Sequence, residues 1–205
     1  MALFITFEGG EGSGKTLQTR ALYRRLLQLA IPALLTQEPG GTVLSKKLAR
    51  LLKWTKNADI SPLTELLMFN ASRVQLVAEV IQPSLKGGKV VICDRYTDST
   101  TAYQSYGRGL DLEMVRAINN VATQGLSPSL TVLLDMPAEK GLARKGVERY
   151  DRFEQEDITF HRKVREGYLK LAADDPERWL VIDARQSKTE IKQIIWQRVS
   201  QLLSG

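Results

Sequence analysis

At 205 residues, with 43% hydrophobic and 25% charged side chains, the chain can bury the core of one domain without disulfides or metal ions. Its single cysteine, Cys93, excludes an internal disulfide, and the short apolar run at residues 3–7 predicts neither a membrane span nor a signal segment, so we expect a cytoplasmic protein. The net charge of +6 is spread along the chain among acidic residues, which fits polyanionic small molecules and does not indicate nucleic-acid binding.

The first predicted element is a strand at Leu3 to Phe7, which leads through a glycine-rich octet into an amphipathic helix from Leu17 to Leu29. The octet fits GxxxxGK(S/T), the pattern of a P-loop, and reads Gly9-Gly10-Glu11-Gly12-Ser13-Gly14-Lys15-Thr16. Backbone N–H groups of such a loop bind phosphate, Lys15 would neutralise the β/γ oxygens, and Thr16 would hold Mg²⁺. The octet therefore predicts a site for a nucleoside triphosphate and its metal.

Further apolar runs predict strands that alternate with helices along the rest of the chain. The strands are Ile31 to Thr36, Lys89 to Cys93, Leu130 to Leu134 and Trp179 to Ile182. The helices are Leu63 to Val80, Leu112 to Val121, Phe153 to Leu171 and Lys188 to Leu203, with Pro83 and then Gly87-Gly88 expected to end the first of them. This alternation predicts a single α/β domain over residues 1–205, with a five-stranded parallel sheet and helices on both faces.

Two residues of the helix predicted after Pro62 point to a nucleobase. Phe69 and Arg73 are four residues apart and therefore project from one face. The ring can stack on a base, and the guanidinium can donate to an exocyclic oxygen, which disfavours cytosine because its amino group would meet another donor. A core aromatic beside a surface arginine is the alternative for this pair.

The third predicted strand ends in Asp94 and Arg95, at the edge of the sheet where ligands bind in such folds. A carboxylate there can serve as a Mg²⁺ partner, and a guanidinium can clamp a phosphate. Because the P-loop already holds the donor, Arg95 is expected to bind the phosphate of the acceptor. An ion pair that caps the strand is the alternative.

The segment from Asp98 to Gln104 follows directly and is rich in hydroxyl groups. If it is helical, Thr100, Tyr103 and Gln104 face one side, where they can contact the polar edge of a base and crowd a ribose 2′ position. Plain helix capping is the alternative.

Residues 141–153 combine glycines at both ends of a short basic stretch with further arginines, which is typical of a mobile lid. None of the variable P-loop positions is cationic, so charge on the transferred phosphoryl group must be stabilised by an arginine from elsewhere. The candidates are Arg144, Arg149 and Arg152, and a solvated loop is the alternative.

The single histidine, His161, lies in a predicted helix and is not expected to be catalytic. A phosphate acceptor is already an anion near neutral pH and needs no general base. The missing base therefore favours a phosphate acceptor over an alcohol.

The motifs taken together resemble bacterial thymidylate kinases over nearly the whole chain. The resemblance rests on Phe7-Glu8-Gly9 before the P-loop, Glu38-Pro39-Gly40-Gly41-Thr42, Phe69 to Arg73, Asp94-Arg95-Tyr96, Ala102-Tyr103-Gln104, Tyr106-Gly107-Arg108-Gly109-Leu110 and Asp151-Arg152-Phe153-Glu154. It implies a nucleoside monophosphate kinase fold, usually a homodimer, that transfers the γ-phosphoryl group of ATP to dTMP and forms dTDP and ADP.

The resemblance also implies individual roles. Arg95 would hold the dTMP phosphate, Phe69 would stack on thymine and Arg73 would donate to its O4, while Thr100, Tyr103, Gln104 and Glu38 would contribute to the substrate pocket. Glu8 would lie near the acceptor sugar and the metal, and Ala184 to Ser187 near the adenine. Gln37 stands where the family pattern most often has arginine, so one cation near the acceptor is missing or replaced.

Three other functions remain open at this point. A related kinase that uses another nucleoside monophosphate would share every motif above. A GTP-binding switch would carry Asn-Lys-x-Asp and Asp-x-x-Gly, and neither pattern occurs in the sequence. An ATPase stimulated by nucleic acid would fit the basic charge but not its even distribution.

Overall fold

The computed structural model describes residues 2–54, 60–145 and 151–204, and within them the chain forms one five-stranded sheet in the order β2-β3-β1-β4-β5. Every neighbouring pair is parallel, so the carboxyl ends of the strands lie along one edge. All five predicted strands are confirmed, with bounds β1 Phe4–Glu8, β2 Ala33–Gln37, β3 Val90–Asp94, β4 Leu130–Asp135 and β5 Trp179–Asp183.

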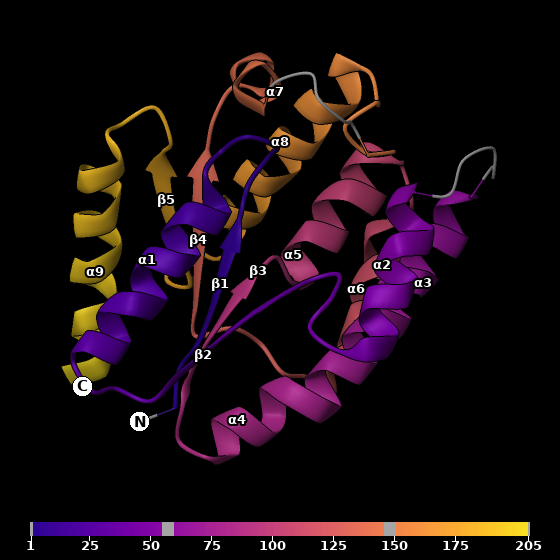
Figure 1. Ribbon diagram of the computed structural model, residues 1–205. Helices are drawn as coiled ribbons and strands as arrows, with labels where there is room; N and C mark the ends of the chain where they lie inside the picture. Colours follow the sequence, from indigo (N-terminus) through magenta and orange to yellow (C-terminus); the bar gives the residue numbers. More distant parts are fainter. Residues whose placement is uncertain (1, 55–59, 146–150, 205) are drawn as a thin grey trace.

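Helices cover both faces of the sheet, as predicted (Figure 1). Helices α1 (Lys15–Gln28) and α9 (Lys188–Ser204) pack on one face, where Leu22 and Ile195 join the core formed by Ile5 and its neighbours. The other face carries α3 (Pro62–Leu76) and α8 (Ile158–Asp174). The remaining helices are α2 Val43–Trp54, α4 Gln82–Lys86, α5 Thr97–Thr100, α6 Leu112–Thr123, α7 Ala138–Lys145 and the π-helical segments η1 Val77–Ile81 and η2 Thr101–Gly107.

The helix after Pro62 ends at Gly87-Gly88, as predicted, but the prediction that Pro83 helps to end it is wrong. The helix begins as expected, because the Ser61 side chain accepts a hydrogen bond from the Thr64 N–H at 3.2 Å, but it continues through η1 and α4 as far as Lys86. Proline lacks an N–H and its ring collides with the carbonyl four residues earlier. The π-helical turn at η1 displaces those carbonyls, so the helix continues past Pro83 and ends only at the glycines that follow.

The helix predicted to begin at Phe153 begins at Ile158 instead. Asp157 is its N-cap, since its carboxylate accepts the Phe160 N–H at 2.8 Å, whereas residues 151–157 form turns. Two helices, α2 and α7, were not predicted at all. No helix in the described ranges has the length and apolar character needed to cross a bilayer.

Candidate active site

The P-loop lies between β1 and α1, at the carboxyl edge of the sheet. Lys15 folds back over the loop and donates to the carbonyl oxygens of Gly9 at 2.9 Å and Gly10 at 2.7 Å, and burial lowers the pKa of Lys15 to about 8. Gly12 has a positive φ of 66° and lies against the backbone of Gly141, so any side chain there would collide with a carbonyl group. The loop therefore packs directly against the backbone at Gly141.

Helix α7 forms the other side of that contact. Gly141, expected as a hinge of the lid, lies inside α7, and a Cβ atom added to it would overlap the carbonyl oxygen of Glu11. The close approach of two backbones therefore accounts for glycine at this position. Gly146, the second expected hinge, lies outside the described residues.

The two residues predicted to hold Mg²⁺ meet across the edge between β1 and β3. The Thr16 hydroxyl donates to Asp94 Oδ2 at 2.7 Å. Hydroxyl and carboxylate oxygens are the ligand types that Mg²⁺ accepts, and it commonly takes only one or two ligands from protein beside phosphate and water. Within the described ranges no group of three or more acidic, histidine or cysteine side chains could bind a metal ion, so this pair is the candidate metal contact.

Arg95 is positioned by an unusual backbone turn directly after β3. Its φ is 72°, in the left-handed region that costs a non-glycine residue about 1 kcal/mol. The turn is held because the Arg95 N–H donates to the Phe7 carbonyl at 3.0 Å and the Tyr96 N–H donates to the Glu8 carboxylate at 2.7 Å. It directs the guanidinium over the P-loop, where Nη1 donates to the Gly9 carbonyl at 3.1 Å.

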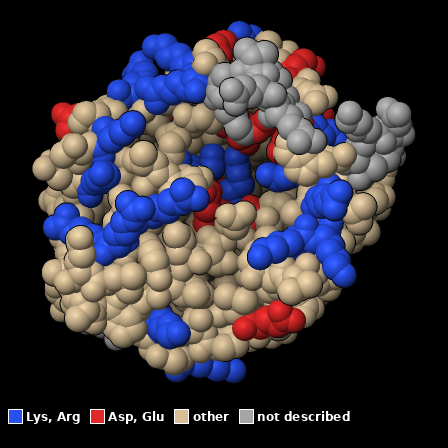
Figure 2. All heavy atoms as spheres, in the orientation of Figure 1, with Lys and Arg blue, Asp and Glu red and all other residues tan. Residues whose placement is uncertain are grey.

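Two pockets meet at Arg95. The P-loop pocket is lined by the phosphate-binding loop together with Gln37 and Asp94. The helix pocket is lined mainly by side chains of α3, α5 and η2. The substrate residues predicted from the sequence come together in its wall, namely Glu38, Phe69, Arg73, Arg95, Thr100, Tyr103 and Gln104. Figure 2 shows a hollow on this face with cationic and anionic atoms in its wall.

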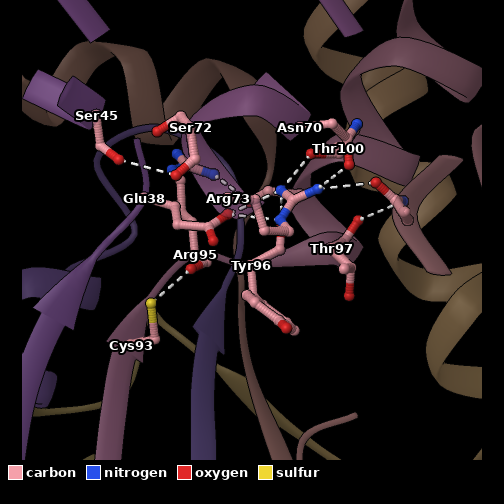
Figure 3. A network of polar contacts seen from close by, with 12 residues as sticks. Glu38, Ser45, Asn70, Ser72, Arg73, Cys93, Arg95, Tyr96, Thr97 and Thr100 are labelled. Carbon is pink, nitrogen blue, oxygen red and sulfur yellow. Dashed lines mark hydrogen bonds and ion pairs between the residues drawn. The ribbon is translucent and has the colours of Figure 1, made fainter. Parts of the chain in front are cut away.

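The Arg73 guanidinium is almost completely buried and all five of its N–H donors have partners (Figure 3). Nε donates to Glu38 at 2.8 Å, and Nη2 donates to the Thr100 hydroxyl at 2.6 Å and to the Tyr96 carbonyl at 3.2 Å. Nη1 donates to Asn70 at 3.0 Å and to Asn119 at 2.8 Å. Arg73 therefore lines the pocket as part of a completed network, and a bound base has to replace one of these partners to reach it.

Glu65, which is fully buried, connects the pocket wall to the end of the expected lid. It accepts from Gln104 at 2.6 Å, from Arg108 at 3.3 Å and from Arg152. Arg152 also donates to the Leu52 carbonyl at 3.1 Å, so it is directed toward α2 and α3.

The other lid arginines are not brought to the phosphates in this structure. Arg144 donates to the Ala184 carbonyl at 3.0 Å, beside the loop expected near the adenine. Neither Arg144 nor Arg152 lines the P-loop pocket. Arg149 lies outside the described residues, and the catalytic roles of all three arginines stay predictions.

Glu8, predicted near the acceptor sugar, lies beneath the pocket and has no exposed surface. Its carboxylate accepts from the hydroxyls of Ser99 and Tyr168, and the same two hydroxyls contact Arg95 Nη1 at 3.2 Å each. Burial and the nearby charge of Asp98 raise the pKa of Glu8 to about 7. Glu8 therefore positions Arg95 from behind.

The sequence analysis included Glu11 in the P-loop but missed what its side chain does, and it did not name Ser99 or Tyr168 as site residues. The Glu11 side chain turns away from the loop and bridges Arg95 at 2.6 Å and the Tyr103 hydroxyl at 3.0 Å. Ser99 and Tyr168 were missed as supports of Arg95. Ser99 lies in the hydroxyl-rich segment that was singled out, which was a usable signal, whereas a variable P-loop position and a tyrosine in a helix carry none.

The chain is similar to known proteins of one family. A family model described as Thymidylate kinase matches residues 7–195. A curated thymidylate kinase from Dehalococcoides mccartyi (strain CBDB1) is 55% identical over 203 residues, covering 99% of this chain and 98% of the relative. One from Synechococcus sp. (strain JA-2-3B'a(2-13)) is 51% identical and covers 95% of this chain and 92% of the relative. The crystal structure of thymidylate kinase from Ehrlichia chaffeensis superposes with a TM-score of 0.74 at 36% identity, over 88% of this chain and 92% of that chain.

Proposed function

The chain belongs to the thymidylate kinase family and transfers the γ-phosphoryl group of ATP to dTMP, and we propose that the transfer takes place where its two pockets meet at Arg95. The observation that carries the proposal is the position of this guanidinium, which lines the P-loop pocket and the helix pocket at once. A donor phosphate in the loop and an acceptor phosphate against Arg95 would face each other. Such positioning supplies most of the catalysis in phosphoryl transfer.

On the donor side, the P-loop amides and Lys15 bind the ATP phosphates, and the positive end of the α1 dipole adds to them. In the ligand-free chain Lys15 bonds to the loop's own carbonyls, so bound phosphate replaces carbonyl oxygens as its partners. Thr16 and Asp94 would hold Mg²⁺, which when bound neutralises the phosphate charge.

On the acceptor side, Phe69 offers its ring to the thymine base, and Arg73 reaches the edge of the base by exchanging one of its present partners, such as the Thr100 hydroxyl, for it. The Phe69 ring lies 5.6 Å from the Phe153 ring, so the two form an apolar wall. Tyr103 and the Glu11 carboxylate bound to it lie between base and phosphate sites, where the sugar would sit and where a 2′-hydroxyl would be crowded.

No general base is needed for this reaction because the acceptor is a phosphate anion. His161 supports this view, since it is buried on α8 against the Phe160 ring and lines neither pocket. Burial also lowers the pKa of His161, which keeps the imidazole neutral.

We further propose that the chain acts as a homodimer in the cytoplasm. Helix α3 exposes an apolar stripe at Leu63, Leu67, Ala71 and Val74, with Leu67 50% exposed. The flanking helices add Leu44 on α2 and Val121 on α6. A stripe of this length is unusual on a monomer and suits a self-complementary two-fold interface.

The dimer is tested by Leu67→Glu, with Leu27→Glu as control because Leu27 is 47% exposed on α1, over the opposite face of the sheet. Sedimentation velocity should show a monomer for the first variant and an unchanged dimer for the second. A wild-type protein that sediments as a monomer would contradict the proposal.

The substrate is tested by coupled ADP-release assays with dTMP, dUMP, UMP, CMP, AMP and GMP. We expect dTMP to have the highest kcat/KM and CMP a very low one, because its amino group would face donors. A different preferred acceptor would identify a related kinase for another monophosphate.

A further inference from the structure

The charge balance where the two pockets meet singles out one lysine. Of the described cationic side chains, Arg95 and Lys53 are the ones that line both pockets. Glu11 and Glu38 also line both, and Asp94 lines the P-loop pocket. An acceptor phosphate brings a charge of about −2 into this acidic surrounding.

Arg95 alone compensates this charge poorly because its guanidinium already has an anionic partner. Its Nη2 lies 2.6 Å from the Glu11 carboxylate, and its Nη1 contacts Ser99, Tyr168 and the Gly9 carbonyl. A phosphate held by Arg95 is therefore beside Glu11 as well, and a second cation would offset that repulsion.

Lys53 has the right position and freedom of movement. It lies in the last turn of α2, its side chain is 38% exposed, and its ammonium pairs with Asp151 Oδ2 at 3.4 Å. An ammonium has three N–H donors, so an incoming phosphate can bind beside or in place of this carboxylate.

Asp151 is held in place independently of Lys53. Its Oδ1 accepts the N–H groups of Phe153 at 3.0 Å and Glu154 at 3.2 Å, and its own N–H donates to Glu154 at 3.0 Å. Because Asp151 is fixed by the backbone, the flexible lysine side chain is the partner that moves. The Asp151 carboxylate lines the helix pocket, so the Lys53 ammonium already binds an anionic group there.

We propose that Lys53 is a second cationic contact for the dTMP phosphate, acting with Arg95, and that Asp151 holds its ammonium at the pocket until the substrate binds. The inference rests on the proposed function, since it concerns the same acceptor site. Gln37 also lines the P-loop pocket but is neutral, so the second positive charge beside the acceptor phosphate comes from Lys53.

The test compares the affinities for dTMP and for thymidine, which lacks the phosphate, by titration calorimetry or competition. Lys53→Met should weaken dTMP binding about tenfold and leave thymidine binding unchanged, because it removes one exposed charge-assisted contact. Lys53→Arg should retain most of the affinity. Lys46→Met is the matched control, because Lys46 lies on the same helix and lines neither pocket.

Two further variants separate phosphate binding from a structural role. Asp151→Asn should bind dTMP as tightly as the wild type or more tightly, since it removes a competitor for the ammonium. Gln37→Arg added to Lys53→Met should recover part of the lost affinity for dTMP and none for thymidine.

Equal losses for dTMP and thymidine, a Lys53→Met affinity that matches the wild type, or an Asp151→Asn variant that reproduces Lys53→Met would each overturn the inference. A wild-type protein that does not prefer dTMP among nucleoside monophosphates would instead overturn the proposed function, so the two failures are distinguishable.

Discussion

Gly141→Ala sets helix propensity against a backbone contact. Alanine stabilises a helix by about 1 kcal/mol relative to glycine, so helix propensity taken alone would raise the melting temperature. The added methyl group, however, would overlap the Glu11 carbonyl of the P-loop. Restoring normal contact requires α7 and the loop to separate by about 1 Å.

The magnitudes predict that activity falls far more than stability. Overpacking costs about 1–3 kcal/mol, and the helix gain offsets part of it, leaving a net loss of up to about 2 kcal/mol. That corresponds to a drop in melting temperature of up to about 8 °C for a chain of this size. A 1 Å displacement of a phosphate-binding loop lowers the rate by about 10²-fold.

Kinetics with saturating dTMP and varied ATP, together with thermal unfolding, measure both effects. Lys140→Ala is the control, because it introduces alanine at the neighbouring exposed position of α7, away from the loop. Wild-type kcat/KM for ATP together with a higher melting temperature in Gly141→Ala would refute the reasoning.

Three further predictions follow from the charges of the site. The buried Lys15 has a pKa of about 8, so at about pH 9 it is mostly neutral, whereas bound triphosphate favours its charged form. ATP binding should therefore take up about one proton at about pH 9 and almost none at about pH 7. Calorimetry of ATP binding in buffers of different ionisation enthalpy measures this uptake. Equal uptake at both pH values would contradict it. Arg95→Ala should lower kcat/KM for dTMP by about 10³-fold in steady-state assays, and near-normal activity would refute its role. The pKa of Glu8 is raised from its ordinary value of 4.5 to about 7, so between these pH values the folded protein keeps this carboxyl protonated while the unfolded chain ionises it. The free energy of unfolding that Glu8 contributes is therefore lost as pH rises from about 4.5 to about 7. In urea unfolding, the free energy of unfolding of Glu8→Gln should lack this part of the pH dependence. The same change with pH in Glu8→Gln and in the wild type would contradict the prediction.

The sheet could be predicted from the sequence because each strand is a short apolar run between turn residues. The strand order and the parallel pairing then bring Thr16 and Asp94 together, as the motif at the end of β3 indicated. Helix α2 escaped prediction although Thr42 caps its start by accepting the Ser45 N–H at 3.1 Å, because this threonine was interpreted only as part of the motif that begins at Glu38. The passage of α3 beyond Pro83 depends on a π-helical turn, which has no signal in local composition.

The residues that line the helix pocket could be predicted from the sequence, but the hydrogen bonds among their side chains could not. Phe69 and Arg73 share a face of α3 by spacing alone, so their presence in one wall was predictable. That Glu38 and Asn119, from distant parts of the chain, complete the donors of Arg73 depends on tertiary packing. The side chain of Glu11 was unpredictable for a similar reason, because its partner Arg95 reaches it only through a strained turn.

The buried Glu65 carboxylate binds Gln104 from the wall of the helix pocket and Arg152 from the end of the expected lid. The wall of the helix pocket and the end of the expected lid are thereby anchored to one anion in a medium of low polarity. Because both contacts depend on the same buried carboxylate, losing one of them alters the electrostatic environment of the other. Substitution of this single acid should consequently loosen both elements at once, although Glu65 lines neither pocket.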